Sequence, residues 1–320
     1  MDTSNDPAEL GRRLAAGDRS CAPEVLNLLE RRGGDSTERT AVLLAKVAPE
    51  TVGHEAPGMI VGITGPPGAG KSTLLAELIV RWRKRDKSVA VLAIDPSSKR
   101  SGGSLLGDRA RLTVDARDAD VLVRSTATAT RLGGLAPATR EAAFALASAF
   151  DVVIVETVGV GQSETDIGEL ADTIVVIVQP ASGDVLQFIK SGVMEIPDIL
   201  VVAKSDLGAV AKRAVRDLKA AVRSLGSSTP VLQTSSLPPA QGVDQLIDSI
   251  EQHFSAVDLA AHRANARRFA ALDSFVHEHG DRGLRALGGR REALKALTAM
   301  PGSLGHRELV NRLEKLSGER

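Results

Sequence analysis

One glycine-rich segment, GITGPPGAGKST at residues 62–73, limits what this chain can fold into more than any other feature. It contains the pattern G-x-x-x-x-G-K-[ST], whose fixed positions are Gly65, Gly70, Lys71 and Ser72. An apolar run precedes the segment and predicts a buried strand, and a run compatible with a helix follows it. A strand, a glycine turn and a helix start direct backbone N–H groups and the positive end of the helix dipole toward an anion. The segment therefore predicts a phosphate-binding loop in an α/β fold.

The phosphate-binding loop supplies the first set of candidate ligand-binding residues. The Lys71 ammonium would reach the β- and γ-phosphates of a nucleotide, and the Ser72 hydroxyl would ligate Mg²⁺. The backbone of the neighbouring residues would surround the phosphates. The full candidate set is Gly65, Pro66, Pro67, Gly68, Ala69, Gly70, Lys71, Ser72 and Thr73.

Composition excludes several other classes of protein. Lys plus Arg and Asp plus Glu both number 40 among the 320 residues, so the chain lacks the positive charge of a non-specific nucleic-acid binder. Aromatic residues make up 2% and tyrosine is absent, which removes platforms for base stacking. The single cysteine, Cys21, allows neither an internal disulfide nor a thiolate metal site, and we expect it to be buried. No apolar run has membrane-spanning length and the N-terminus does not resemble a signal peptide, so we expect a cytoplasmic protein with no membrane partner.

Hydrophobic periodicity predicts three segments along the chain. Residues 1–57 have helical periodicity, residues 58–255 alternate between strands and helices as a nucleotide-binding domain, and residues 256–320 are helical only. The mild excess of basic residues in the last segment is typical of a solvated helix face, whereas its apolar stripes are typical of a subunit interface, and both alternatives stay open. Predicted strands occupy 59–64, 88–94, 120–125, 151–156, 173–178, 198–203 and 230–234. Several are continuous β-branched runs, which favour a mostly parallel, doubly wound sheet flanked by helices, as in P-loop NTPases.

Carboxylates follow two of the predicted strands and are candidate magnesium ligands. Asp95 ends the second strand at the sheet edge where ligands of doubly wound folds bind, and could ligate Mg²⁺ directly or through water. The alternative for Asp95 is a helix N-cap or a turn residue. Glu156 follows the fourth predicted strand, where nucleotide switches place the acidic residue that senses Mg²⁺. Gly159 could present its N–H to the γ-phosphate because no side chain projects from its Cα.

The segment Ala203-Lys204-Ser205-Asp206 resembles N-K-x-D, which reads guanine. The Asp206 carboxylate would accept from N1–H and the 2-amino group of guanine, whereas adenine would leave it unpaired at a cost of roughly 1–3 kcal/mol. The stem of Lys204 could lie against the base. Alanine replaces the usual asparagine, so one tie between the base loop and the phosphate loop, worth about 0.5–1.5 kcal/mol, is lost. We therefore expect weaker guanine binding with the guanine preference retained.

A hydroxyl-rich segment follows the last predicted strand and completes the candidate base site. Its residues Ser235, Ser236 and Leu237 could direct backbone N–H groups toward the guanine carbonyl. The alternative for both base-site segments is ordinary turn chemistry at strand ends.

Taken together, these motifs resemble the MeaB/ArgK-type GTPases, chaperones of methylmalonyl-CoA mutase. The resemblance covers roughly residues 60 to 240. It is carried by GPPGAGKS, DPSS after the second strand, GGSLLGDRARL, RLGGLA, ETVGVGQSE and SGVMEIPDILVVAKSDL. It implies hydrolysis of GTP to GDP and phosphate with Mg²⁺. Lys71 and Ser72 would bind phosphate and metal, Asp206 would bind guanine, and a further group would surround the metal and its waters: Asp95, Asp108 and Glu156.

The resemblance also implies partners. Members gate delivery of adenosylcobalamin to the mutase, or to a related adenosylcobalamin-dependent acyl-CoA mutase, and protect or reactivate it. The family form is a homodimer joined by C-terminal helices, and Lys190 matches the lysine of a mobile loop that communicates nucleotide state. The chain departs from the family at Ala203, at Ser236 and in the segment at 125–130. These departures predict weaker guanine binding or a divergent partner.

Two alternative functions share the phosphate-binding loop. A P-loop kinase or ATPase would need an acceptor pocket and a base, and no sequence pattern indicates either. A nickel-delivery GTPase would need His or Cys ligands near the nucleotide. Five of the six histidines instead lie late in the chain, at 253, 262, 277, 279 and 306, with His54 before the first strand.

Overall fold

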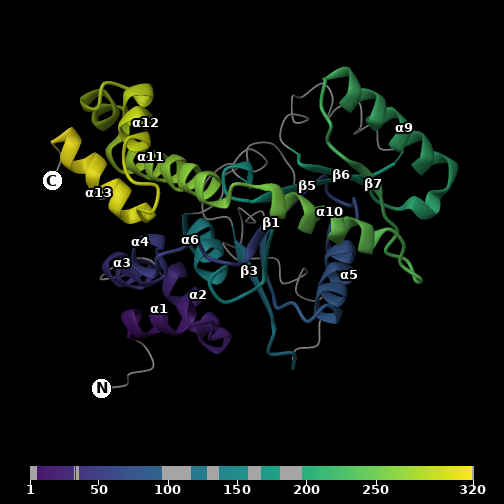
Figure 1. Cartoon of the computed structure of the whole chain (residues 1–320), viewed down its shortest axis with the longest axis horizontal. Helices are drawn as coiled ribbons and strands as arrows, with labels where there is room; N and C mark the ends of the chain where they lie inside the picture. The colour runs from purple at the N-terminus through teal and green to yellow at the C-terminus, as the bar shows by residue number, and fades with distance from the viewer. Residues whose placement is uncertain are drawn as a thin grey trace, which may run out of the picture. The chain divides into compact units, whose positions relative to one another are not determined.

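The structure is a computed structural model that describes residues 6–31, 33, 36–95, 117–127, 137–157, 167–180 and 197–318. The chain forms two compact units. The first comprises residues 1–58, 137–149 and 257–320, and the second comprises 59–136 and 150–256 (Figure 1). The second unit contains the glycine-rich loop.

The second unit is built on a parallel sheet of seven strands in the order β3-β2-β4-β1-β5-β6-β7. The strands are β1 (Met59–Thr64), β2 (Val89–Asp95), β3 (Val121–Ala127), β4 (Val152–Thr157), β5 (Thr173–Val178), β6 (Ile199–Val202) and β7 (Val231–Gln233). Each begins and ends within one or two residues of its predicted position. The parallel, helix-flanked sheet expected from the sequence is confirmed.

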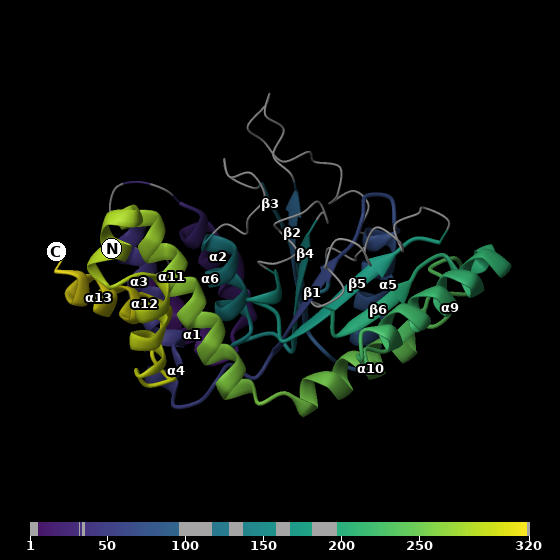
Figure 2. The same ribbon diagram turned by 90° about the horizontal axis from the view of Figure 1, so that it is seen from above.

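Apolar side chains explain why these strands lie in the interior of the unit. Every residue of β1, β4 and β5 is buried, as expected for parallel strands covered on both faces. Helices α5 (Lys71–Lys84) and α10 (Val243–Ala256) pack on each other and share one core with alternate residues of the strands. The core includes Trp82, the only tryptophan of the chain. Helix α9 (Ala209–Ser224) packs on β6 and β7, and Figure 2 shows it running beside β6.

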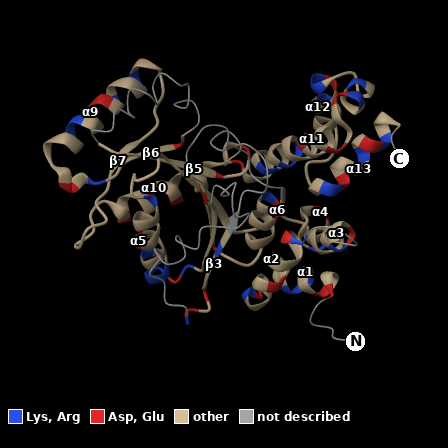
Figure 3. Ribbon diagram, turned by 180° about the vertical axis from the view of Figure 1, so that it is seen from behind, with Lys and Arg blue, Asp and Glu red and all other residues tan. Residues whose placement is uncertain are grey.

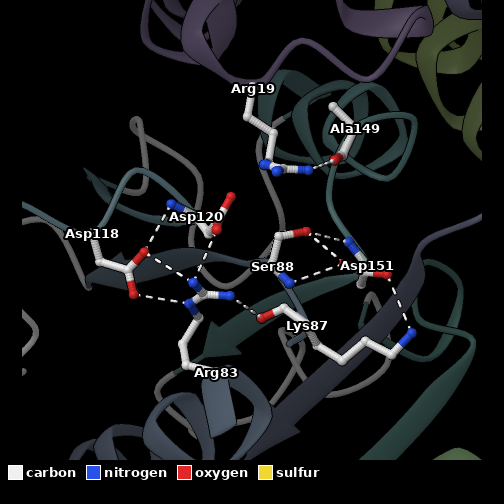
Figure 4. Close-up of polar contacts among 8 residues, drawn as sticks. All are labelled: Arg19, Arg83, Lys87, Ser88, Asp118, Asp120, Ala149 and Asp151. Carbon is white, nitrogen blue, oxygen red and sulfur yellow. Dashed lines mark hydrogen bonds and ion pairs between the residues drawn. The ribbon is translucent and has the colours of Figure 1, made fainter. Parts of the chain in front are cut away.

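Aspartates immediately before strands anchor the amino edge of the sheet. Asp172 accepts a hydrogen bond of 2.7 Å from the N–H of Ile60 at the start of β1, and Asp198 accepts one of 2.8 Å from Ile174 in β5. Asp151 accepts from both the N–H and the hydroxyl of Ser88, just before β2 (Figure 4). Each carboxylate satisfies a donor where a strand begins, so these residues fix the register at the edge opposite the glycine-rich loop.

Ion pairs at the same edge tie α5 to the start of β3. Arg83 donates to Asp118 at 2.8 Å and to Asp120 at 2.9 Å, and Lys87 lies 3.3 Å from Asp151 (Figure 4). The Arg83 hydrogen bond lowers the pKa of the Asp118 carboxyl. Burial raises the pKa of Asp151, but its hydrogen bonds to Ser88 and Lys87 outweigh this and the net pKa is lowered. These charges therefore stabilise the sheet and lie away from the candidate nucleotide site.

Helices from both ends of the chain, together with one internal helix, form the first unit. They are α1 (Pro7–Ala15), η2 (Arg19–Cys21), α2 (Ala22–Glu30), α3 (Ser36–Val47), α4 (Pro49–Val52), α6 (Pro137–Leu146), α11 (Leu259–Ala286), α12 (Arg290–Thr298) and α13 (His306–Ser317). Helix α11 is kinked at Gly280, whose φ is 61°. Cys21 is buried, as expected, and burial raises the pKa of its thiol to about 11. In Figure 4, Arg19 donates to the carbonyl of Ala149 within this unit.

Two buried arginines of α11 hold the segment that leads into β1. Arg263 donates two hydrogen bonds of 2.6 Å to the carbonyls of Ala56 and Gly58. Arg267 pairs with both carboxylate oxygens of Glu55, at 2.8 and 2.6 Å. Bidentate pairing of a buried guanidinium fixes geometry as well as neutralising charge. The arginines thus fix the path of the chain through residues 55–58.

A buried polar contact joins α6 to the C-terminal helices. The Nδ1 atom of His306 lies 3.9 Å from Oε1 of Glu141, and its Nε2 atom lies 3.1 Å from the Ser274 hydroxyl. Burial lowers the pKa of His306 to about 4 and raises that of Glu141 to about 7. Between these two pKa values the imidazole and the carboxyl are both neutral, so they do not form an ion pair, and 3.9 Å is longer than a hydrogen bond.

Candidate functional site

The glycine-rich loop connects β1 to α5 at the carboxyl edge of the sheet, as predicted. Gly65, Gly68 and Gly70 have φ values of 150°, 75° and 95°, which side chains disfavour. A Cβ atom on Gly65 would lie 2.2 Å from the carbonyl oxygen of Ile177 in β5, so the loop passes directly over a neighbouring strand. Gly70 offers no side-chain cap to α5, which leaves the first N–H groups of the helix available to an anion.

Lys71 begins α5 and lies within the loop it helps to form. Its side chain is 7% exposed, and its Nζ donates to the carbonyls of Gly65 at 2.7 Å and Pro66 at 3.1 Å. The ammonium is therefore already beside the loop where phosphate would bind. Of the other loop positions, Ala69 is buried, whereas Pro67, Gly68 and Thr73 are exposed.

The structure brings Ser72 and Glu156 together, although 84 residues separate them in sequence. Glu156 lies in β4 opposite Ile63 of β1, and the Ser72 hydroxyl lies 3.4 Å from its Oε1 atom. Two oxygen ligands of one octahedral Mg²⁺ lie about 3 Å apart, given metal–oxygen distances of about 2.1 Å. A hydroxyl and a carboxylate at this separation fit a magnesium ion without rearrangement of the strands.

Of the remaining predicted site residues, the structure describes the backbone of Asp95. Asp95 ends β2, which pairs with both β3 and β4, so its backbone lies at the same carboxyl edge as Glu156. Asp108, Gly159 and Lys190 lie outside the described residues.

The predicted base-reading segment lies beside the phosphate loop. Lys204 adopts a left-handed conformation with φ of 54°, and its Nζ donates to the carbonyl of Gly68 at 2.9 Å. The sequence predicted that a hydrogen bond between the base loop and the phosphate loop is lost at Ala203, which is 5% exposed. It did not predict the hydrogen bond that Lys204 makes between the same two loops. A charged donor makes a stronger hydrogen bond than a neutral amide. Lys204 therefore joins the loops where asparagine is absent.

Hydrogen bonds organise the carboxylate proposed to read the base. The hydroxyl of Ser235 donates to Oδ1 of Asp206 at 2.8 Å and accepts from the N–H of Leu237 at 3.3 Å. The N–H of Ser205 donates to the carbonyl of Thr234, which joins the two base-site segments. Leu237 is 60% exposed beside them, and Ser236 is half-buried. The predicted residues of both segments are thus held together with one oxygen of Asp206 oriented.

Buried hydroxyls at the same edge were not anticipated from the sequence. Thr64 ends β1, Thr157 ends β4 and Thr234 follows β7, and each is at most 1% exposed. Their Oγ1 atoms have no hydrogen-bond partner among the described residues. A buried hydroxyl without a partner is costly, so these atoms are candidate contacts for a ligand or its water. Their positions at the ends of predicted strands were the feature of the sequence that could have identified them as candidate ligand contacts.

Side chains suited to nickel do not gather at this edge within the described ranges. Within the described residues, the group of side chains that could hold a metal ion lies instead in α11 and α13 of the first unit and consists of Glu278, His279 and Glu314. Across the same ranges, no helix combines the length and apolarity needed to cross a membrane.

Comparison with known proteins agrees with this geometry. The family profile of the methylmalonyl-CoA mutase-associated GTPase MeaB matches residues 23–281. A relative from Pyrococcus abyssi, named as a GTPase, is 43% identical over 81% of this chain and 80% of its own length. The methylmalonic aciduria type A homolog of Mus musculus, named as mitochondrial, is 34% identical over 78% of this chain and 64% of its own.

Among solved structures, the fold is similar to that of an LAO/AO transport system kinase. The TM-score is 0.68 with 26% identity, and the match covers 98% of each chain. HypB from Helicobacter pylori, solved in complex with nickel, has a TM-score of 0.50 at 21% identity over 68% of this chain, which shows a similar fold alone. The phosphate loop, the Ser72–Glu156 contact and the matching family profile together establish that the chain belongs to the MeaB family of methylmalonyl-CoA mutase-associated GTPases.

Proposed function

We propose that this chain hydrolyses GTP with Mg²⁺ and acts as a chaperone of an adenosylcobalamin-dependent acyl-CoA mutase. The observation that carries the proposal is the convergence of three functional groups at one edge of the sheet. These are the Lys71 ammonium on the phosphate loop, the Ser72–Glu156 oxygen pair and the Asp206 carboxylate held by Ser235. On this proposal they would bind the phosphate, the metal and the base of a guanine nucleotide.

The chain's own residues would act by positioning and charge neutralisation rather than as a covalent nucleophile. Lys71 would exchange its loop carbonyls for β- and γ-phosphate oxygens. Ser72 and Glu156 would hold Mg²⁺ with its waters, joined by Asp95 and Asp108, and the ion would neutralise phosphate charge. Gly159 would donate its N–H to the γ-phosphate. Phosphate release would then alter the loops that sense the terminal group, including the loop carrying Lys190.

Guanine selectivity would come from Asp206. Its second carboxylate oxygen is left for N1–H and the 2-amino group of guanine, which adenine cannot supply. An unpaired carboxylate costs roughly 1–3 kcal/mol, or a 5- to 150-fold preference for GTP over ATP.

The partner proposed is methylmalonyl-CoA mutase or a related acyl-CoA mutase, because the family is defined by that association. In this role, nucleotide state gates delivery of adenosylcobalamin and protects or reactivates the mutase. We further propose a homodimer formed through residues 256–320, with the nucleotide-binding domain at 58–255 and the N-terminal helices at 1–57. A cytoplasmic location stays a prediction.

A single variant tests base recognition. In Asp206→Asn the amide would donate to the 2-oxo group of xanthine, so we expect weak GTP binding and restored binding of XTP, measured by titration with fluorescent nucleotides. Loss of both nucleotides would indicate a folding defect, which Trp82 fluorescence would report. Unchanged GTP binding, or equal binding of GTP and ATP to the native chain, would refute guanine recognition.

The partner is tested separately by GTP turnover with and without the cognate mutase. We expect a complex on gel filtration and at least a tenfold change in turnover. If GTP is hydrolysed but the mutase neither binds nor changes the rate, the GTPase assignment stands and the chaperone role fails. Transfer of phosphate to a third molecule would instead favour the kinase alternative.

A further inference from the structure

We propose that the exposed face of α9 is a docking surface for an acidic patch on a partner protein. The surface, here called the basic stripe, consists of Lys212, Arg216, Lys219 and Arg223. This inference does not depend on the nucleotide or on the identity of the mutase.

The helical period places the four basic residues on one face. Their spacings of four, three and four residues confine them to a sector of roughly 60°, over about 16 Å of helix axis. All four are exposed, while the opposite side of α9 is buried against the sheet through Ala211, Ala214, Leu218, Ala221 and Val222. Figure 3 shows Lys and Arg positions spread along the length of α9.

Among the residues that the structure describes, no acidic side chain compensates the charge of the basic stripe. None of its four side chains forms an ion pair within the described residues, and the one acidic residue of α9, Asp217, lies 3.8 Å from Arg213 on a different flank. By contrast, the three arginines of α5 are each paired with carboxylates: Arg81, Arg83 and Arg85. Where this chain needs arginine to stabilise its own fold, it supplies an acidic neighbour. Within the described residues, the four residues of the basic stripe have no such neighbour.

The character of the stripe favours an acidic protein surface over a nucleic acid or a membrane. A chain with zero net charge lacks the positive electrostatic potential that binds nucleic acid, and the absence of tyrosine removes side chains that stack on bases. The exposed neighbours on this side of the helix are Ala209 and Ala220, which are too small to insert into lipid. Small side chains beside the charges instead let a protein surface approach closely, with electrostatic complementarity setting specificity and association rate.

The test uses the full chain and a fluorescein-labelled 20-residue polyglutamate peptide as the acidic probe. In the stripe variant all four basic residues become glutamate. In the matched control, four other exposed basic residues on different helices become glutamate, so the total change in charge is the same. They are Arg282, Arg285, Arg291 and Lys315. Binding is measured by fluorescence anisotropy at 50 and 200 mM salt. Duplex DNA and phosphatidylserine vesicles serve as competing probes.

We expect the native chain and the control to bind the peptide, with weaker binding at the higher salt, and the stripe variant to bind at least tenfold more weakly. A variant with glutamine at the four stripe positions should show an intermediate loss of peptide affinity. It replaces the glutamate variant in the test if Trp82 fluorescence shows that the glutamate variant does not fold. Three results would overturn the proposal: no peptide binding by the native chain, equal loss in the control, or tenfold tighter binding of DNA or vesicles than of peptide at the same salt.

Discussion

Substituting alanine for the first glycine of the phosphate loop should destabilise the second unit through a specific collision. In Gly65→Ala the new Cβ would lie 2.2 Å from the carbonyl oxygen of Ile177, far inside normal contact. The φ of 150° adds strain, because side chains disfavour that conformation. Strain of this kind costs on the order of 1–3 kcal/mol, and forcing the loop from a strand costs about the same again. We therefore expect a loss of roughly 2–6 kcal/mol in the free energy of unfolding.

Gly68 provides a matched control in the same loop. Its φ of 75° also disfavours a side chain, but no atom lies within 4 Å of the Cβ that alanine would add. Gly68→Ala should therefore cost only about 1–2 kcal/mol. Urea unfolding monitored by Trp82 fluorescence compares the two, since Trp82 is buried in the core that packs on the sheet. Equal losses in both variants would refute the collision as the cause.

Two further predictions concern groups outside the nucleotide site. Asp172→Ala removes the acceptor for the N–H of Ile60 and should cost about 1–3 kcal/mol by urea unfolding; an unchanged midpoint would contradict this. The second concerns pH. His306 in the unfolded chain takes up its proton near pH 6.5 but in the folded chain only near 4, so its contribution to stability is lost as pH falls between these values. Glu141, with a pKa of about 7 instead of 4.5, contributes stability that is lost as pH rises across that range. The slopes oppose each other between pH 4.5 and 6.5. There, His306→Gln should make stability fall with rising pH and Glu141→Gln should make it rise, by at most about 1.4 kcal/mol per unit; two flat profiles would contradict this.

Local patterns were sufficient to predict the sheet and the phosphate loop. Runs such as Val152 to Val155 are apolar over most of a strand. Such a continuous run by itself predicts a parallel strand buried on both faces, without knowledge of distant residues. The pairing of Ser72 with Glu156 was also predictable in kind, because Ser72 follows β1 and Glu156 lies near the carboxyl end of the adjacent parallel strand β4. Carboxyl ends of parallel strands meet at one edge, so position in sequence determines position in space.

Contacts that depend on side-chain reach and on helix packing could not be predicted in this way. Nothing local to Lys204 indicates that its ammonium crosses to the carbonyl of Gly68, because that contact depends on the left-handed backbone of the lysine. Similarly, α6 has ordinary helical periodicity, and only packing on α2 and α3 places it in the first unit. The aspartates at the amino edge read as loop residues until their strand partners are known.

The contact made by Lys204 also changes what restoring the usual asparagine should achieve. On the proposed assignment, Ala203→Asn would add a tie between the base loop and the phosphate loop, worth about 0.5–1.5 kcal/mol, or roughly 2- to 13-fold in nucleotide affinity. Because Lys204 already joins the loops through Gly68, we expect a gain at the lower end of that range. The tie orders the loops and does not itself read the base, since discrimination belongs to Asp206, held by Ser235. GTP and ATP affinities should therefore rise by the same factor, measured side by side by calorimetric titration with Mg²⁺. A gain confined to GTP would show instead that the residue at position 203 contributes directly to guanine selectivity.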